Sequence, residues 1–360
     1  MRLRLQPLTG PEIELGVADG LFTEPDTTDA DIVDCTARIA LPGLVDAHAH
    51  LQANGVDEMV AAGEPEDAVM AANALAQIEA GVLLIADKGS KSDATLDFLD
   101  SDPARRPELH MAGEILVVED GYYPRFGRVI DPTLAGTVAA DAATTRASWV
   151  KFIGDWPRRG LGPISNFTEP QLAAAVAAAH ANGARVAIHT MAPGTATAAV
   201  SAGVDSIEHG LFLTRDDVVA LGVRRGAWVP TVAAMEAAGD TMRPGSSGRR
   251  LVEEGLDNVR ELLPVAIAAG VHVLAGTDLA LRHGQVAIEM MRLGDYGIAP
   301  ADVIASTIYG AYDYLGTDAR LAVGHRADVV CVAGDPREDL SSLADPTFVM
   351  RRGNVIRSAR

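Results

Sequence analysis

Cysteine, lysine and tryptophan are rare in this sequence, with two, three and three copies among 360 residues. Cys35 and Cys331 lie near opposite ends of the chain without a metal-type spacing, so neither a disulfide framework nor a cysteine-based metal site is indicated. The opening residues, MRLRLQPLTG, lack the apolar run of a signal peptide, and no stretch of about 18 apolar residues predicts a membrane span. We therefore expect a cytoplasmic protein that does not enter a membrane.

Positive charge is also scarce, because 30 Lys and Arg residues face 49 Asp and Glu residues and leave a net charge of -19. A phosphate backbone would be repelled by this charge, which argues against nucleic acid as a partner. Hydrophobic residues make up 48% of the chain, enough for a large buried core. The composition is typical of a globular enzyme with a small-molecule substrate, and a homo-oligomer is compatible with it.

From Gly43 onward, short apolar runs alternate with alanine-rich segments of helical length. This alternation predicts parallel strands joined by crossover helices. Eight such units in about 270 residues match the size of a closed (β/α)8 TIM barrel rather than an open sheet. The expected strands are residues 44–51, 82–87, 108–118, 149–154, 185–190, 205–210, 227–231 and 272–279.

The two ends of the chain resemble each other and differ from the middle. Both consist of short polar and β-branched runs broken by glycine and proline, which predicts small strands joined by turns. Because the termini of a barrel lie close together, we expect residues 1–42 and 318–360 to form one composite β-domain, a small β-sandwich, beside a barrel of residues 43–317.

The segment LPGLVDAHAHL carries two histidines one residue apart, His48 and His50. Alternate residues of a strand share one face, so both imidazoles can reach one metal ion. Imidazole is the commonest protein ligand for zinc-type metals. The spacing alone supplies only two ligands, whereas a catalytic zinc ion usually has three, and two ordinary histidines are the alternative.

More polar residues, Lys151, His189, His209 and Asp278, stand at the C-terminal ends of predicted strands, where the active sites of such barrels are built. Lys151 is informative because the chain has only three lysines. An unpaired buried ammonium is costly, so its pKa falls and the neutral amine can capture carbon dioxide. The resulting carbamate is able to bridge two metal ions. A salt-bridged core lysine is the alternative.

In order along the chain, LVDAHAHL, WVKFIG, VAIHT, SIEHG and GTDLA resemble the motifs of the amidohydrolase superfamily of metal-dependent hydrolases. The resemblance covers essentially the whole chain. The segments AHANGARVAIHT, AGVDSIEHG and VGHRADVVCVAGDP are most similar to its imidazolonepropionase-like and Xaa-Pro-dipeptidase-like branch. The last of these segments matches the companion β-domain of the superfamily.

The resemblance implies six ligands for two divalent metal ions, namely His48, His50, Lys151, His189, His209 and Asp278. The first two histidines and the aspartate would hold the more buried ion, the other two histidines the more exposed ion, and a carbamate on the lysine would bridge them. A metal-bound hydroxide would attack a carbonyl, and Asp278 would carry its proton to the leaving group. Zinc is the metal we expect first, although iron, manganese or cobalt suits the same ligands.

At two positions this sequence differs from particular branches of the superfamily, and these differences limit the reactions that we expect. Imidazolonepropionases do not use the lysine position, so Lys151 favours the binuclear, peptidase-like relatives. Zinc deaminases place a glutamate shortly after the histidine of strand five, whereas this chain has HTMAPG there. Hydrolysis of a small amide is therefore the main prediction. The alternatives are a lactone or ester hydrolase with the same metals, a mononuclear deaminase, and a scaffold without catalysis.

Two loops are the richest in aromatic residues and arginine, EDGYYPRFGR after the third strand and GDWPRRGLG after the fourth. Their aromatic rings could wall a substrate, and an arginine could bind a carboxylate in a bidentate manner. This pattern suggests an N-acyl amino acid, a dipeptide or a cyclic amide, while ordinary solvated loops are the alternative. The candidate substrate contacts are Tyr122, Tyr123, Arg125, Trp156, Arg158, Arg159 and His283.

Overall fold

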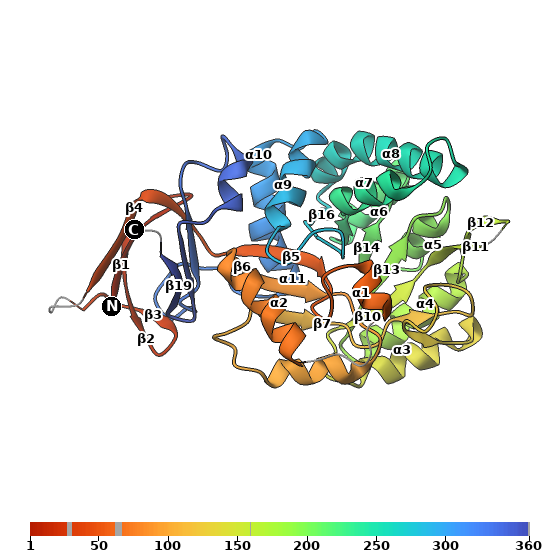
Figure 1. Ribbon diagram of the computed structural model, residues 1–360, viewed down its shortest axis with the longest axis horizontal. Helices are drawn as coiled ribbons and strands as arrows, with labels where there is room; N and C mark the ends of the chain where they lie inside the picture. Colours follow the sequence, from red (N-terminus) through yellow and green to blue (C-terminus); the bar gives the residue numbers. More distant parts are fainter. Residues whose placement is uncertain (27–30, 62–66, 159, 359–360) are drawn as a thin grey trace.

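The computed structural model describes residues 1–26, 31–61, 67–158 and 160–358, and it has a TIM-barrel-like α/β fold (Figure 1). Its central strands are buried and pair in parallel, as continuous apolar runs predict. These strands are β5 (Leu44–Ala49), β6 (Val82–Asp87), β7 (Glu108–Met111), β10 (Trp149–Ile153), β13 (Arg185–Thr190), β14 (Ser206–His209), β15 (Ala227–Val229) and β16 (His272–Val273). All eight predicted strands have a counterpart.

Strand pairing divides the eight strands between two sheets. β5, β6 and β7 pair in that order in one sheet, and β10, β13, β14, β15 and β16 pair in the other. Backbone contacts cross both seams, because Ala112 forms a parallel bridge with Trp149 and Ala47 N donates to Ala275 O at 2.8 Å. The predicted barrel class is confirmed in its TIM-barrel-like form, whereas continuous closure of one ring is not detected in the described residues.

Helices cover the outside of these strands (Figure 1). They are α1 (Val56–Ala61), α2 (Asp67–Glu79), α3 (Ala135–Ala143), α4 (Glu169–Ala181), α5 (Thr195–Ser201), α6 (Arg215–Val223), α7 (Val232–Thr241), α8 (Ser247–Ala269), α9 (Val286–Asp295), α10 (Pro300–Ile304) and α11 (Ala311–Leu315). Helix α4 is followed by Gly183 in the left-handed region at φ +80°, a common way for a helix to end.

The predicted third strand, residues 108–118, is interrupted in the structure. β7 ends at Met111, and Leu116–Val117 form a separate short strand, β8, which pairs with β10 and with β9 (Arg128–Val129). The Asp93 carboxylate accepts a hydrogen bond from the Glu114 N–H at 2.7 Å and lies 2.0 Å from where a Cβ on Gly113 would be. Asp93 thus packs directly against the interrupted segment, where Glu114 still forms a parallel bridge with Ser90.

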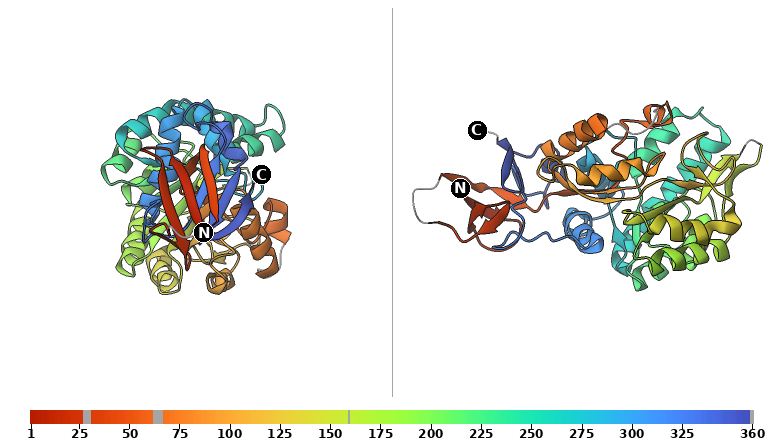
Figure 2. Two further views of the ribbon diagram at one scale, coloured as in Figure 1. Left: turned by 90° about the vertical axis from the view of Figure 1, so that its left-hand side faces the viewer. Right: turned by 90° about the horizontal axis from the view of Figure 1, so that it is seen from below.

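Strands from both ends of the chain pair in one seven-stranded sheet, which we call the terminal sheet. Its order is β19 (Asn354–Ser358), β18 (Phe348–Arg351), β17 (Val329–Val332), β4 (Ile32–Leu41), β1 (Arg2–Pro7), β2 (Ile13–Ala18) and β3 (Leu21–Thr23). The sheet lies at one end of the molecule with both termini beside it (Figures 1 and 2). Because strand pairing gives one continuous sheet, the expected two-layered sandwich is not confirmed. The domain boundaries at residues 42/43 and 317/318 stay a prediction.

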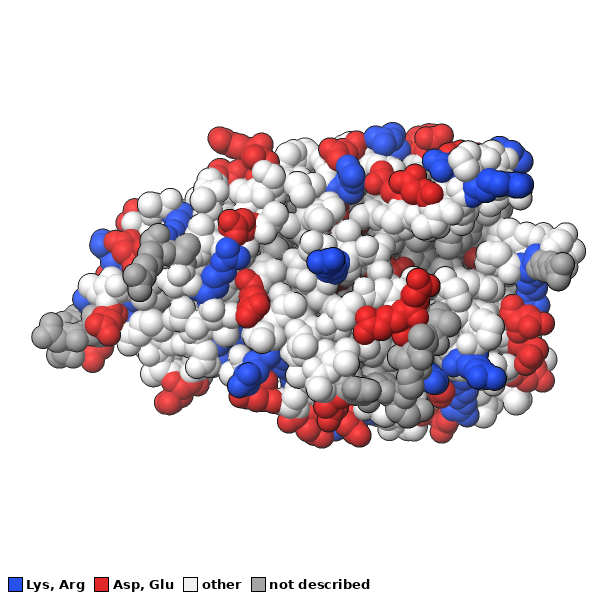
Figure 3. Space-filling model, viewed as in Figure 1, with Lys and Arg blue, Asp and Glu red and all other residues white. Residues whose placement is uncertain are grey.

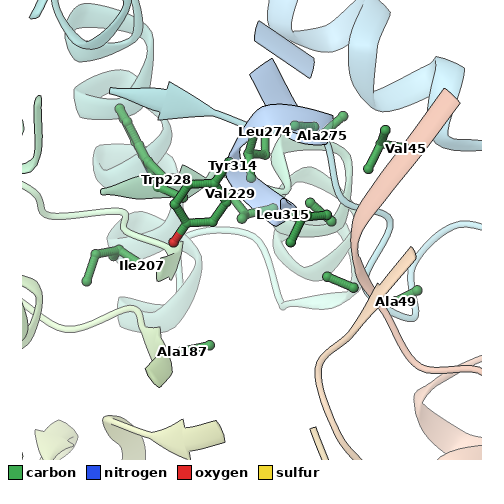
Figure 4. Close-up of a cluster of buried hydrophobic side chains, with 14 of the residues drawn as sticks. Val45, Ala49, Ala187, Ile207, Trp228, Val229, Leu274, Ala275, Tyr314 and Leu315 are labelled. Atoms are coloured by element: carbon green, nitrogen blue, oxygen red, sulfur yellow. The ribbon is translucent and has the colours of Figure 1, made fainter. Parts of the chain in front are cut away.

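Apolar side chains of the central strands and the last barrel helix pack together beneath the C-terminal strand ends. Figure 4 shows Ile207, Trp228 and Val229 from β14 and β15 close to Tyr314 and Leu315 of α11. Each of these side chains is less than 10% exposed. This core holds the strand ends rigidly, as a site built from several strands requires. Among the described helices, none has the length and hydropathy that a membrane-spanning segment requires.

Candidate metal centre and cavity

Strand β5 brings two histidines to the C-terminal side of the barrel. His48 lies in the strand and His50 follows directly after it, and both are almost fully buried. Opposite them lies Asp278, whose Oδ1 atom is 3.5 Å from His48 Nε2 and 3.4 Å from His50 Nε2. Two atoms that each lie about 2.0–2.1 Å from a tetrahedral zinc ion are about 3.3 Å apart. These three side chains therefore have the spacing of a metal-ligand set.

Hydrogen bonds at the far side of the rings fix which nitrogen is free. His50 Nδ1 lies 2.6 Å from the Gly89 carbonyl, which can only accept, so Nδ1 carries the proton. His209 Nδ1 lies 2.6 Å from Thr231 Oγ1, and that hydroxyl already donates to the Pro230 carbonyl at 2.8 Å. In both histidines the Nε2 lone pair is thereby directed into the site. Such support is the usual arrangement for histidine ligands of metals.

Lys151, His189 and His209 come from β10, β13 and β14, and each is at least nine-tenths buried. His209 Nε2 lies 4.0 Å from Asp278 Oδ2. The Lys151 Nζ and His189 Nε2 atoms are buried without a hydrogen-bond partner among the described residues. Buried polar atoms are rarely left unpaired, and a role in binding an ion is one of the ordinary reasons for an exception. The side chains therefore fit a bound metal ion.

Lys88 is a second buried lysine, and it differs from Lys151 in having a partner. Its Nζ lies 3.1 Å from Glu208 Oε1 and 3.9 Å from the centre of the Trp149 ring. Burial lowers the pKa of Lys151 to about 8, with the nearby Lys88 charge acting in the same direction and Glu208 and Asp278 opposing it. Lys88 is thus a paired structural lysine, and Lys151 is the one whose amine is free to react.

Burial keeps three of the four histidines neutral, as metal binding requires, whereas the pKa of His50 is raised because Asp278 and Asp87 outweigh the opposing effect of burial. It lowers the pKa of His48 to about 4 and that of His209 to about 3, and it holds the pKa of His189 well below its usual value. Burial alone would raise the pKa of Asp278, but its interactions with His48, His50 and His209, including a hydrogen bond from His50, hold that pKa well below its usual value. At neutral pH His48, His189 and His209 therefore present imidazole lone pairs beside an ionised carboxylate.

Three residues of the site have left-handed backbone conformations that non-glycine residues seldom adopt. His209 has φ +62°, Thr231 has φ +48° and Asp278 has φ +46°. Asp278 is held there by its N–H, which donates to the His48 carbonyl at 2.7 Å. Such strain costs about 1–3 kcal/mol per residue and concentrates at functional sites. Here it turns the ends of three strands toward one point.

Two buried carboxylates support the ligands and were not recognised in the sequence. Glu208 Oε2 lies 2.8 Å from His48 Nδ1. Asp46 accepts hydrogen bonds from Thr277 N at 3.1 Å and Thr277 Oγ1 at 2.6 Å, and it thereby ties β5 to the segment that carries Asp278. Asp46 precedes His48 by two residues, so it shares its strand face, and this spacing could have identified it.

All six predicted ligands line one cavity of about 750 Å³ at the C-terminal side of the barrel. Three aromatic residues form one wall, with ring centres 4.7–5.0 Å apart: Tyr122, Tyr123 and Trp156. The opposite wall is apolar and includes Ala234 and Met235 of α7. Figure 3 shows a hollow in this face of the molecule with acidic side chains beside it, over α1.

The other predicted substrate contacts lie elsewhere. Arg125 is exposed at φ +63°, and Arg158 Nη2 donates to Asn166 Oδ1 at 2.8 Å; neither lines the cavity. His283 Nε2 donates to the Ala53 carbonyl at 2.9 Å and lies outside the cavity lining. Arg159 lies outside the described residues. The arrangement therefore gives no support to a carboxylate clamp built from Arg125 or Arg158.

Comparison with known proteins agrees with this geometry. A family model described as "Amidohydrolase family" matches residues 39–357. The uncharacterized protein Rv2915c of Mycobacterium tuberculosis strain H37Rv is 33% identical over 376 residues, covering 99% of this chain and 96% of that protein. The family model covers the barrel and the C-terminal strands of the terminal sheet, and the mycobacterial relative covers the N-terminal strands as well.

Solved structures share the fold at low sequence identity. A Xaa-Pro dipeptidase with methionine in its active site superposes with a TM-score of 0.82 at 20% identity, covering 98% of each chain. The ochratoxinase of A. niger superposes with a TM-score of 0.81 at 16% identity, covering 99% of this chain and 95% of that chain. At this identity the likeness establishes the fold alone.

Proposed function

From the premise that this chain belongs to the amidohydrolase family, whose members generally use metal ions, we propose that it hydrolyses a carbon–nitrogen amide bond of a small substrate with two divalent metal ions. One observation carries the proposal. Side chains from five strand ends converge on one cavity, and two of their buried nitrogen atoms, Lys151 Nζ and His189 Nε2, have no partner among the described residues.

His48, His50 and Asp278 would hold one ion, and His189 and His209 would hold the other. Zinc suits this set of nitrogen and carboxylate donors. Bound divalent ions would supply Lewis-acid polarisation of the substrate carbonyl and a lower pKa for the attacking water. The side-chain oxygens of Asp278 lie within 3.4–4.0 Å of three ligand histidines, so this carboxylate is placed to accept the proton of that water.

We further propose that Lys151 carries a carbamate. Its neutral amine would attack carbon dioxide, forming an N–C bond as one C=O π bond opens and a proton leaves the nitrogen. The product would carry one negative charge delocalised over two oxygens, each of which could bind a metal ion. The unpartnered, buried Nζ on the same cavity wall as the five other ligands supports this assignment. Lys88 is an unsuitable alternative because Glu208 already pairs with it.

The substrate classes that follow are N-acyl amino acids, dipeptides and cyclic amides. Purified protein, loaded with zinc, manganese or cobalt, is to be tested on a panel of these compounds together with lactones, with the metal content measured on the same sample. We expect about two ions per chain and turnover of amides. Fewer than one ion per chain under replete conditions, with no turnover of any acyl compound, would contradict the proposal, and turnover of lactones alone would replace it.

A further inference from the structure

The described residues at the entrance of the cavity carry negative charge without a matching positive charge. Asp57 and Glu58, in the first turn of α1, line the cavity and are exposed to solvent. Glu58 accepts a hydrogen bond from Asn54 N at 3.0 Å, and neither carboxylate forms a salt bridge with a described residue. The one described cation that lines the cavity is Lys151, which lies buried at the metal centre.

An aromatic cluster connects this acidic entrance to the metal centre. Tyr122 and Trp156 lie 6.4 and 5.8 Å, ring centre to ring centre, from His189. Tyr123 contacts both of them, at 5.0 and 4.8 Å. The Tyr123 pKa is raised by burial, by Asp278 and by Asp57, so the charge of Asp57 reaches this hydroxyl. We call Asp57, Glu58 and these three aromatic residues the cavity mouth.

Two features of a site favour the binding of an organic cation: aromatic ring faces, and carboxylates that have no positive partner. The negative face of an aromatic ring attracts ammonium groups, by about 0.5–1 kcal/mol at exposed sites and more when water is excluded. An anionic group at the same position would meet two carboxylates and no described cation. The methionine and alanine side chains on the remaining wall, Met59, Met191, Met235, Ala234, Ala237 and Ala238, suit the hydrocarbon part of such a molecule.

We propose that the cavity mouth binds a protonated amine or quaternary ammonium group of the substrate while the scissile amide lies over the metal ligands. This inference rests on the proposed amide hydrolysis and names its substrate class, an amide with a cationic side group. It also replaces the expectation that an arginine grips a substrate carboxylate. The charged group selects the substrate, and the metal ligands break the bond.

Three substrates that share one scissile bond test the inference: the p-nitroanilides of N-acetyl-lysine, N-acetyl-norleucine and N-acetyl-glutamate. For the metal-loaded enzyme we expect kcat/KM to be about tenfold higher for lysine than for norleucine, and lowest for glutamate. The preference should shrink in 0.5 M NaCl, because the mouth is open to solvent and salt screens exposed charges. Equal rates for the three compounds, or a preference for glutamate, would overturn the inference while leaving the amide hydrolysis intact.

Variants locate the effect. Asp57→Asn combined with Glu58→Gln should raise KM for the lysine compound about tenfold and leave the norleucine compound unchanged. Tyr123→Leu should act in the same direction with a smaller change. Asp216→Asn is the matched control, because Asp216 is also an exposed acid in the first turn of a helix, α6, but lies outside the cavity lining. An equal loss on all substrates in the double variant would contradict a charge-reading role.

Direct binding separates failure of this inference from failure of the proposed function. Titration calorimetry with benzyltrimethylammonium, using benzyl alcohol and benzoate as neutral and anionic controls, requires no turnover. We expect binding of the cation alone, weakened about tenfold in the Asp57→Asn, Glu58→Gln variant. If none of the anilides is cleaved but the cation binds in this way, the mouth is correctly assigned and the chemistry is not. If the cation fails to bind, the inference is wrong whatever the enzyme hydrolyses.

Discussion

The same parallel strands end differently on the two sides of the barrel. At their C-terminal ends, β10 and β13 direct Lys151 and His189 into a cavity of about 750 Å³ with buried nitrogen atoms left unpaired. At the opposite side, a second cavity of about 590 Å³ is lined by charged residues, several of which form ion pairs. There His180 pairs with Asp205 at 2.8 Å, and Arg225 pairs with Asp313 at 2.8 Å.

The contrast shows which side of the barrel contains groups that are unfavourable for folding stability. At the N-terminal side ion pairs satisfy His180 and Asp205 and also Arg225 and Asp313, although Arg224 Nε has no partner among the described residues. At the C-terminal side Lys151 Nζ and His189 Nε2 face one cavity without partners, which is unfavourable for folding. Substitutions at the C-terminal side should therefore lower activity more than stability, and substitutions at the N-terminal side should lower stability more than activity.

Lys151→Met tests the C-terminal side most severely. Removing the amine that we propose to carry the carbamate should lower kcat/KM at least about 10³-fold and reduce the bound metal from about two ions to one. The free energy of unfolding should stay the same or rise, since an unpaired buried amine is replaced by an apolar side chain of similar length. Steady-state kinetics, metal analysis and denaturant unfolding measure the three quantities.

The matched control is Lys88→Met, the same exchange at a paired buried lysine. It leaves Glu208 buried without its cation and should destabilise the protein by about 3–5 kcal/mol. Near-normal activity in Lys151→Met, or an equal loss of stability in both variants, would contradict the assignment of Lys151 to catalysis and Lys88 to stability.

Asp278→Asn should have the next largest effect. The amide keeps the size of the carboxylate but cannot accept the proton of the attacking water, so kcat should fall about 10²–10⁴-fold with little change in the fold. Circular dichroism and thermal unfolding check the fold, and kcat and KM measured separately check the chemistry. A variant with unchanged kcat would show that proton transfer uses another group.

Glu289 supports the helix that forms part of the cavity wall. The Glu289→Gln substitution should change how the free energy of unfolding depends on pH. Glu289 is fully buried on α9, and its two carboxyl oxygens accept hydrogen bonds from the first N–H groups of α7, at 2.7 and 2.9 Å. Burial raises the pKa of this carboxyl to about 8 in the folded protein, from an ordinary value of 4.5. Between these values the unfolded chain loses the proton that the folded chain keeps, so stability falls as pH rises.

The slope is at most about 1.4 kcal/mol per pH unit, and Glu289→Gln should lack it. Urea unfolding at pH 5, 6, 7 and 8 gives the comparison. Parallel pH profiles for the two proteins would mean that the folded state holds Glu289 ionised, with the N–H groups of α7 outweighing burial.

Arg225→Ala should have the smallest effect of the four. Its ion pair with Asp313 is 70% and 67% exposed, and such surface pairs contribute at most about 1 kcal/mol. We expect unchanged kcat/KM and metal content, with a small loss of stability that disappears at high salt. A clear fall in kcat/KM would show that the N-terminal side of the barrel communicates with the cavity.

The sequence was informative where chain topology alone decides position. C-terminal ends of parallel strands meet on one side of the barrel, so polar residues that end apolar runs could be predicted to gather, and the structure brings the six together. Their role as ligands stays a prediction. Glu208 was missed because the sequence does not show whether a carboxylate inside a strand contacts another side chain or solvent, whereas the spacing of Asp46 from His48 was available and was overlooked.

Loops were predicted least well, because contacts distant in sequence fix them. Tyr122 and Trp156 line the cavity as expected, yet Arg158, two residues after Trp156, binds Asn166 instead. At the break in the predicted third strand, too, the local contacts come from residues distant in sequence, the Asp93 carboxylate and the backbone of Ser90. The residue types within a loop do not show which residues from other parts of the chain will contact it.

The terminal sheet sets an order of events during synthesis. β4 pairs with β1, which the ribosome has already released, and with β17, whose residues 329–332 emerge nearly 300 residues later. Until then one edge of β4 has exposed N–H and C=O groups, and an open edge invites pairing with other chains. Strand β17, near the C-terminus, thus covers the open edge of β4, near the N-terminus. A nascent chain halted before residue 329 would keep that edge of β4 unpaired.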